Sequence, residues 1–130
     1  MRPKPYKDPP ETLGERLCKK RTLRGSLLKD TARQLGINAW TYRNWEQDRT
    51  KPAVRFIPTI IDFLEYDPFP APQTLGERIR ARRQRLGLSQ ERLSKLLGVD
   101  EGCVMRWERG EWTPTALTRR RIDVFLRASP

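Results

Sequence analysis

Residues 87–110 read GLSQERLSKLLGVDEGCVMRWERG, a stretch that predicts two short helices with a very short break between them. Ser89 is a candidate N-cap and Gly98 a candidate left-handed stop, so the first helix is expected between these two residues. Asp100 is a second candidate cap, and it follows only two residues later. A break as tight as this one makes the two helices cross steeply.

The second of these helices is expected to have an inward and an outward face. Val104 and Trp107 are three residues apart, a spacing that turns both side chains toward a core. The outward face then carries Glu101, Gly102, Met105 and Arg106. Two steeply crossed helices, with the outward face of the second one left free, form a helix-turn-helix arrangement.

The chain contains this pattern twice. Residues 12–64 align with residues 74–126 without a gap, 62 positions apart, and 15 of the 53 pairs are identical. Both copies open with TLGER, in which a Thr and a Glu three residues later fit a capping box at a helix start. In the first copy Asn38 is the candidate cap, and Tyr42 and Trp45 face inward. Because a solenoid needs three or more units, two copies predict tandem domains.

The composition favours an anionic partner and argues against several enzyme classes. The formal charge is +11, of which +6 falls in residues 1–65 and +5 in residues 66–130, and this predicts binding to nucleic acid or to an anionic membrane surface. The chain has no His, two scattered Cys and no glycine-rich phosphate loop, so we expect no enzyme, no cofactor and no metal site. No apolar run reaches the roughly 18 residues of a membrane span, and the first ten residues lack the apolar segment of a signal peptide, which predicts a cytoplasmic protein.

These residues resemble a known family. Residues 87–110 look like the helix-turn-helix of the Cro and phage-repressor (lambda-repressor-like) family, with Gln90, Ser94, Gly98, Val104 and the closing Trp-Glu-Arg-Gly in register. The first copy resembles the family less closely, because Leu28 stands where the Gln belongs and Asp48 replaces the Gly after the third helix. The resemblance implies an all-α fold with two tandem helix-turn-helix domains of about four helices each.

The repeat also predicts the domain boundaries. We expect a disordered basic arm over residues 1–11, a degenerate first domain over 12–65, a proline-rich linker over 66–73 and a second domain over 74–130. The linker has three prolines within five residues, which makes it extended and semi-rigid. Domains of this family dimerise through elements after the fourth helix, and none is evident here. The chain is therefore expected to act as a monomer that forms an intrachain pseudo-dimer, or else as a homodimer.

The resemblance assigns roles to several charged and polar residues. It implies structural ion pairs between Arg21 and Glu46 and between Arg83 and Glu108. It also implies DNA phosphate contacts from Gln90, near the start of the second helix of the domain, and we add the cations around the turn that closes each third helix. The predicted phosphate contacts are Gln90, Arg109, Arg49, Lys51 and Arg55.

The outward residues of the third helix are the candidates for reading base edges in the major groove. By register these are Glu101, Gly102 and Arg106 in the second copy, and Ala39, Trp40, Thr41 and Asn44 in the first. Arg106 suits guanine O6 and N7, Asn44 suits adenine N6 and N7, and Glu101 suits the amino group of cytosine. The alternative is that these are solvated helix residues and that Trp40 is a packing or interface residue.

The sequence thus predicts a sequence-specific regulator of transcription that binds double-stranded DNA. Its resemblance points to a prokaryotic or phage protein, and repression by occupancy of the site is the simplest mechanism for it. The alternative is an antitoxin or adaptor that uses the same fold mainly to bind another protein. Membrane-surface binding is disfavoured, because the helices look core-packed and lack a free apolar face.

Overall fold

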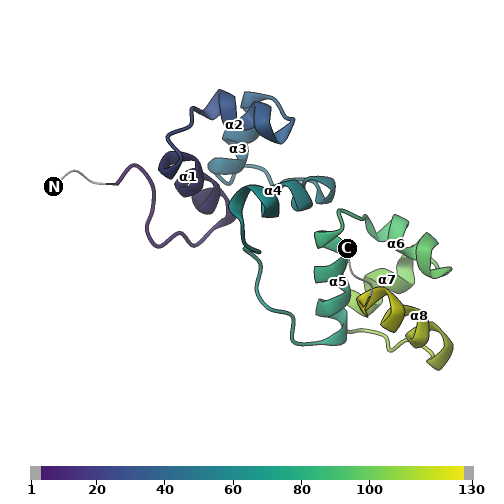
Figure 1. The fold of residues 1–130 in the computed structure, drawn as a ribbon. Coiled ribbons are helices and arrows are strands. Elements are labelled where there is room, and N and C mark those ends of the chain that lie inside the picture. Colours follow the sequence, from purple (N-terminus) through teal and green to yellow (C-terminus); the bar gives the residue numbers. More distant parts are fainter. Residues whose placement is uncertain (1–3, 128–130) are drawn as a thin grey trace. The chain divides into compact units, whose positions relative to one another are not determined.

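Helices supply all the regular secondary structure within residues 4–127, the part of the chain that the computed structural model describes (Figure 1). The elements are α1 (Leu13–Leu23), α2 (Leu28–Leu35), α3 (Ala39–Glu46), the short 3-10 helix η1 (Val54–Phe56), α4 (Ile57–Leu64), α5 (Leu75–Arg85), α6 (Gln90–Leu97), α7 (Glu101–Glu108) and α8 (Ala116–Arg127). The all-α prediction is confirmed for these residues. The bounds of α1, α2 and α3 recur 62 positions later, residue for residue, as those of α5, α6 and α7.

Local sequence signals explain where these helices begin and end. Thr12 and Thr74 are the N-caps of α1 and α5, and each forms a complete capping box with the Glu three residues later. Gly36 and Gly98 end α2 and α6 with φ angles of 75° and 70°, a left-handed conformation that glycine adopts without steric cost. The capping boxes and the left-handed stop at Gly98 that the sequence predicts are therefore present.

Gly14 and Gly76, the third letter of each TLGER, let two helices approach very closely. A Cβ atom at Gly14 would lie 2.4 Å from the carbonyl oxygen of Trp45, and one at Gly76 would lie 2.2 Å from that of Trp107. Real Cβ atoms essentially never come within 3.0 Å of such an atom. The start of α1 therefore packs directly on the backbone at the end of α3, and the start of α5 does the same on α7.

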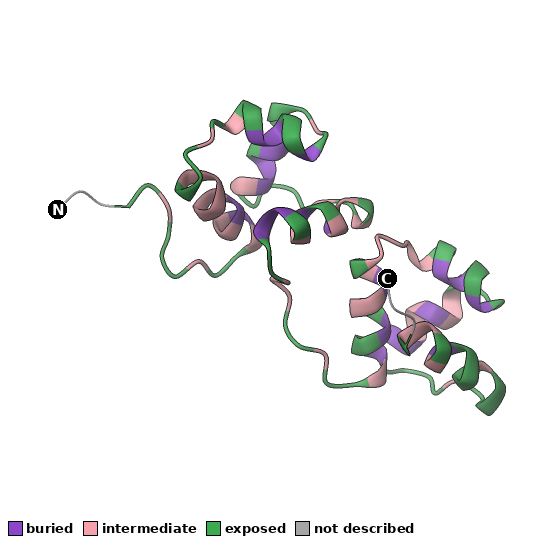
Figure 2. Cartoon of the chain, in the orientation of Figure 1, coloured by how far each residue is buried: buried purple, intermediate pink, exposed green. Residues whose placement is uncertain are grey.

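The chain divides into two compact units. The first comprises residues 1–53 with 59–68, and the second comprises residues 69–130 with 54–58. In the second unit a core of Ile79, Leu93, Leu97, Val104, Trp107 and Ile122 is drawn from all four of its long helices. In Figure 2 exposed positions separate the buried ones of α6, and partly exposed positions separate those of α7. Each helix is thus amphipathic and contributes one face to the core.

The first unit buries a similar set of apolar side chains, together with the polar Thr31 and Asn44. Its buried apolar residues include Leu17, Ala32, Leu35, Tyr42, Trp45, Ile60, Phe63 and Leu64. Thr31, at the position that matches Leu93, is only 1% exposed. Within the described chain its hydroxyl has no hydrogen-bond partner. A buried hydroxyl in this state destabilises a core.

Residues 4–11 lie along α1, where the sequence predicted a disordered arm. Lys19 on α1 forms an ion pair with Asp8, with 2.9 Å between Nζ and Oδ1, and the Cys18 thiol approaches the carbonyl oxygen of Pro5. Hydrogen bonds from Lys4 and Lys19 lower the pKa of Asp8 to about 2. Acidic residues within and beside this segment therefore neutralise the positive charge of its lysines. The count of basic residues did not reveal this pairing. Arg2 lies outside the described residues.

Candidate nucleic-acid interface

In the second unit α6 and α7 pack against each other across the short break that the sequence predicts. The Ser89 hydroxyl accepts a hydrogen bond from the backbone N–H of Arg92 and caps α6. Three residues, Gly98–Asp100, connect α6 to α7. Asp100 occupies the N-cap position of α7, although its side chain forms no capping hydrogen bond within the described chain. Val104 and Trp107 are buried, so the orientation of α7 is set by the core.

The opposite face of α7 is open. Glu101 is exposed, and Gly102 and Arg106 are partly exposed. The guanidinium of Arg106 lies over the indole ring of Trp112, 4.3 Å from the ring centroid. The three residues predicted to read bases in this copy are therefore together on one face, beside an aromatic residue that the sequence analysis did not include.

Glu108 at the end of α7 is the centre of a buried polar network. Its side chain is fully buried, and Arg83 contacts it through two hydrogen bonds of 2.7 and 2.9 Å. Arg80 and Gln90 also donate to Glu108, at 3.3 and 3.1 Å. The ion pair implied by the resemblance is thus present. Gln90, the predicted phosphate contact, has its side-chain amide held against α7 by this bond.

The first unit contains the matching ion pair with fewer donors around it. Arg21 donates to Glu46 at 2.6 and 3.1 Å, and this hydrogen bonding raises the pKa of Arg21. Cys18 and Leu28 stand at the places of Arg80 and Gln90, and neither side chain carries a nitrogen donor. The acidic residue at the end of α3 is therefore tied to α1 and not to the start of α2.

Three of the four predicted base contacts of the first unit are accessible. Ala39 and Trp40 are exposed, Trp40 by 65%, and Thr41 is partly exposed. The expectation that Asn44 faces outward is wrong, because only 9% of its surface is exposed. Asn44 is a short side chain one turn after the bulky Trp40, whereas the matching Arg106 is long and follows Gly102.

The predicted phosphate-binding cations are all at the surface. Arg109, Arg49, Lys51 and Arg55 are exposed, and the Arg55 guanidinium stacks on the Phe56 ring at 4.8 Å. Arg43 of α3 is a further exposed cation that the sequence prediction did not include. Its position three residues after Trp40 places it on the same helix face, and this register was the available signal.

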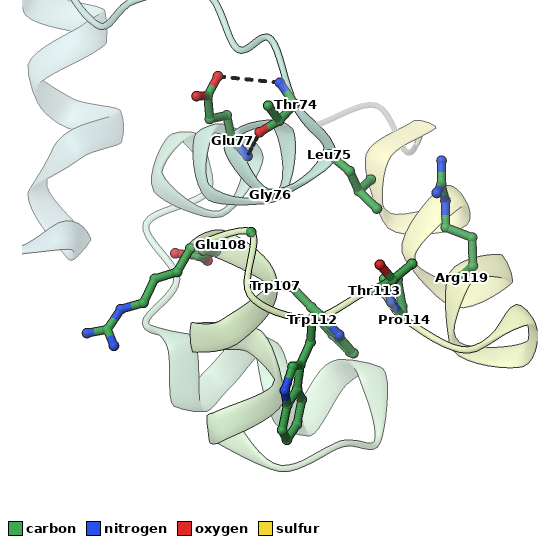
Figure 3. Close-up of a pocket in the computed structure, with 12 residues that line it drawn as sticks. Thr74, Leu75, Gly76, Glu77, Trp107, Glu108, Trp112, Thr113, Pro114 and Arg119 are labelled. Atoms are coloured by element: carbon green, nitrogen blue, oxygen red, sulfur yellow. Dashed lines mark hydrogen bonds between the residues drawn. The ribbon is translucent and has the colours of Figure 1, made fainter.

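A surface hollow lies beside the end of α7. It is lined by Thr74, Leu75, Gly76, Glu77, Trp107, Glu108, Arg109, Gly110, Trp112, Thr113, Pro114 and Arg119. Figure 3 shows the capping box between Thr74 and Glu77 on one side of this hollow, and Arg119 of α8 on another. The hollow therefore joins the starts of α5 and α8 to the segment that follows α7.

Two other kinds of site were sought in the described part of the chain. Over residues 4–127 there is no group of three or more His, Cys, Asp or Glu side chains that could hold a metal ion. None of the helices in that range has the length and apolarity that crossing a membrane requires.

Part of this chain is similar to known proteins. Residues 74–130 match the model of a helix-turn-helix domain family. The chain is 40% identical over 58 residues to repressor protein C2 of Salmonella phage P22, and 40% identical over 57 residues to the HTH-type transcriptional regulator DicA of Escherichia coli. These segments cover 45% and 44% of this chain, but only 27% and 42% of the two relatives.

No solved structure matches the chain at a significant level. The family model agrees with the short break observed between α6 and α7. Residues 74–130 therefore match a helix-turn-helix domain, and part of the chain is similar to a phage repressor and to a transcriptional regulator.

Proposed function

We propose that the second unit binds double-stranded DNA sequence-specifically, with α7 in the major groove. The observation that carries this proposal is the open face of α7, where Arg106 is accessible on a helix of a phage-repressor-type domain. The names of the relatives, a repressor and a transcriptional regulator, support the same reading. The formal charge of +11 supports it further, because it favours a polyanionic partner.

In this proposal each surface residue has a defined role. Arg106 reads guanine through O6 and N7, Glu101 accepts a hydrogen bond from cytosine, and Gly102 lets the backbone approach the bases. Gln90 and Arg109 contact phosphates on either side of α7 and set its register on the duplex. The bond from Gln90 to Glu108 links the phosphate contact to the end of the reading helix.

We propose further that residues 12–65 form a second, degenerate helix-turn-helix domain. Its helices repeat the bounds of the second unit, and its ion pair and close helix crossing are built in the same way. Ala39, Trp40 and Thr41 would present a less polar surface to DNA, with Arg49, Lys51 and Arg55 on phosphates. Residues 66–73 then serve as the linker, and the two domains form either an intrachain pseudo-dimer or half of a homodimer.

The biological consequence of such binding is regulation of transcription. We propose repression by occupancy of the DNA site, which the names of the two relatives, a repressor and a transcriptional regulator, support. Tethering also matters, because two domains on one short linker bind with a high effective concentration. Even a weak first domain would then add to the affinity of the whole chain.

The test begins with selection of bound duplexes from a random pool by the full chain. Arg106→Ala is expected to relax the preference at one base pair, by a factor of about 10 to 100, while Gln90→Ala weakens binding to all duplexes. Lys95→Ala, which removes one exposed charge from α6, is the control. The logarithm of the binding constant should fall linearly with the logarithm of salt concentration, with a slope of about −0.9 per phosphate contacted. Recovery of no preferred sequence would rule out this function.

A second candidate function is an adaptor or antitoxin that binds another protein. Trp40 is the observation that favours it, since a Trp exposed by 65% on α3 is typical of interface anchors. This function predicts that binding to DNA is weak and that the affinity for the protein partner changes little with salt. If Trp40→Ala abolishes binding to the protein partner and leaves DNA binding unchanged, the adaptor or antitoxin function is favoured over base reading by the first unit.

A further inference from the structure

Trp112 and Arg106 form a close cation–π contact. The distance from the Arg106 guanidinium to the ring centroid is 4.3 Å, compared with 4.8–5.9 Å in four other contacts of this kind in the described part of the chain. Trp112 is 51% exposed, so the core does not account for its position. The contact restricts a long side chain that otherwise has several rotatable bonds.

The turn after α7 is what brings Trp112 to this place. The backbone N–H of Gly110 donates to the carbonyl oxygen of Trp107 at 3.0 Å, and that of Glu111 donates to Arg106 at 2.9 Å. Gly110 has a φ angle of 75°, which reverses the chain at the end of α7. The residue after Glu111 is therefore carried back over the helix face that bears Arg106.

Gly102 provides space on the other side of the guanidinium. A Cβ atom at Gly102 would lie 3.4 Å from Nη1 of Arg106, which is already van der Waals contact. A larger side chain there would compete with Arg106 for the surface of α7. At the three matching positions the first unit has Trp40, Asn44 and Thr50, and Asn44 is buried. The arrangement is therefore specific to the second unit.

We propose that Trp112 is a positioning residue for base readout: it holds the Arg106 guanidinium on the open face of α7, ready for a guanine edge. This inference rests on the proposed function of the second unit. A preorganised guanidinium loses less conformational entropy when it binds the base, so its contribution to discrimination is larger. Because the first unit lacks this arrangement, the proposal also implies that the second unit, and not the first, discriminates at the guanine position.

The experiment uses the full chain and the preferred duplex selected from the random pool. Arg106→Ala first identifies the base pair at which discrimination is lost. At that base pair Trp112→Ala is expected to lower discrimination by about two- to fivefold, the range of an exposed cation–π contact, and Trp112→Phe should restore most of it. Adding Trp112→Ala to Arg106→Ala should change nothing more. Thr50→Ala, the matching position of the first unit, is the control, and far-UV circular dichroism checks the fold.

The outcomes separate this inference from the proposed function. If no duplex is preferred, or if Arg106→Ala changes no base preference, base reading by Arg106 fails and the inference fails with it. If Arg106→Ala abolishes one preference while Trp112→Ala leaves it intact, only the role of Trp112 is wrong. Sharper discrimination in Trp112→Ala would show that the ring withholds the guanidinium from DNA. Trp112→Ala could instead lower the affinity for all duplexes equally and additively with Arg106→Ala. Trp112 would then contact the DNA backbone or stabilise the fold, and the inference would be wrong.

Discussion

Adding one methyl group at Gly76 is expected to destabilise the second unit strongly. In Gly76→Ala the new Cβ would lie 2.2 Å from the carbonyl oxygen of Trp107 and 3.0 Å from that of Glu108. Both are backbone atoms at the end of α7, so neither can rotate away as a flexible side chain would. To reach even 3.0 Å, the start of α5 must move about 0.8 Å from α7.

The magnitude follows from two opposing contributions. Overpacking that shifts backbone costs about 1–3 kcal/mol, and the absence of a flexible neighbour places this site at the upper end. Replacing Gly by Ala within a helix contributes about 1 kcal/mol in the stabilising direction. The net loss in the free energy of unfolding is therefore about 2 kcal/mol, which lowers the melting temperature of a domain of this size by roughly 8–16 °C.

A matched variant in the same unit should change stability in the opposite direction. At Gly102 on α7 an added Cβ would meet only Nη1 of Arg106, the end of a flexible side chain. Gly102→Ala should therefore stabilise the unit by about 0.5–1 kcal/mol through helix propensity alone. Amide hydrogen exchange measured by mass spectrometry reports on α5–α8 separately, and peptides from α1–α3 provide an internal reference. Equal or greater protection of α5–α8 in Gly76→Ala than in the wild type would refute this account of the TLGER motif.

Three further predictions concern buried polar groups. Thr31→Val removes an unpartnered buried hydroxyl and should stabilise the first unit by about 1–3 kcal/mol, measured by urea unfolding. Glu108→Ala leaves Arg83 buried without its partner and should cost about 3–5 kcal/mol; a smaller cost than for Glu46→Ala would contradict the denser network around Glu108. Burial raises the pKa of Tyr42 above its usual 10.0, so its stabilising contribution is complete below pH 10 and declines as the pH rises further. Relative to Tyr42→Phe, the wild type should therefore lose about 1.4 kcal/mol per pH unit above pH 10, which urea titrations at several pH values can measure.

The parts of the fold that depend on short-range sequence were predictable. A capping box needs residues three apart, and a left-handed stop needs a glycine, so Thr12, Thr74 and Gly98 marked helix ends without knowledge of distant contacts. The apolar spacing of Val104 and Trp107 likewise identified the buried face of α7. The ion pairs came from the resemblance, because nothing local indicates that Arg83 and Glu108 will meet.

The surface details were less predictable, because they depend on neighbours that are not at helical spacing. Trp112 contacts Arg106 through a turn whose path is set by Gly110. The position of Asn44 along the helix predicted an outward side chain. Asn44 is nevertheless buried, because it is short and lies one turn after the bulky Trp40. The sequence prediction treated the lysines near the N-terminus as unpaired charges, yet Asp8 forms ion pairs with both Lys4 and Lys19.

By itself, the amino-acid sequence determined the helical type of the fold and the ends of several helices, together with a duplicated plan and a strongly cationic chain. These properties depend on caps, glycine stops, apolar spacing and composition, all of which act over a few residues or over the whole chain at once. Only the tertiary structure decided which side chains are left on the open face of α7 and why Gly14 and Gly76 are glycines. Those outcomes depend on backbone atoms far apart in sequence coming within van der Waals distance, which packing alone establishes.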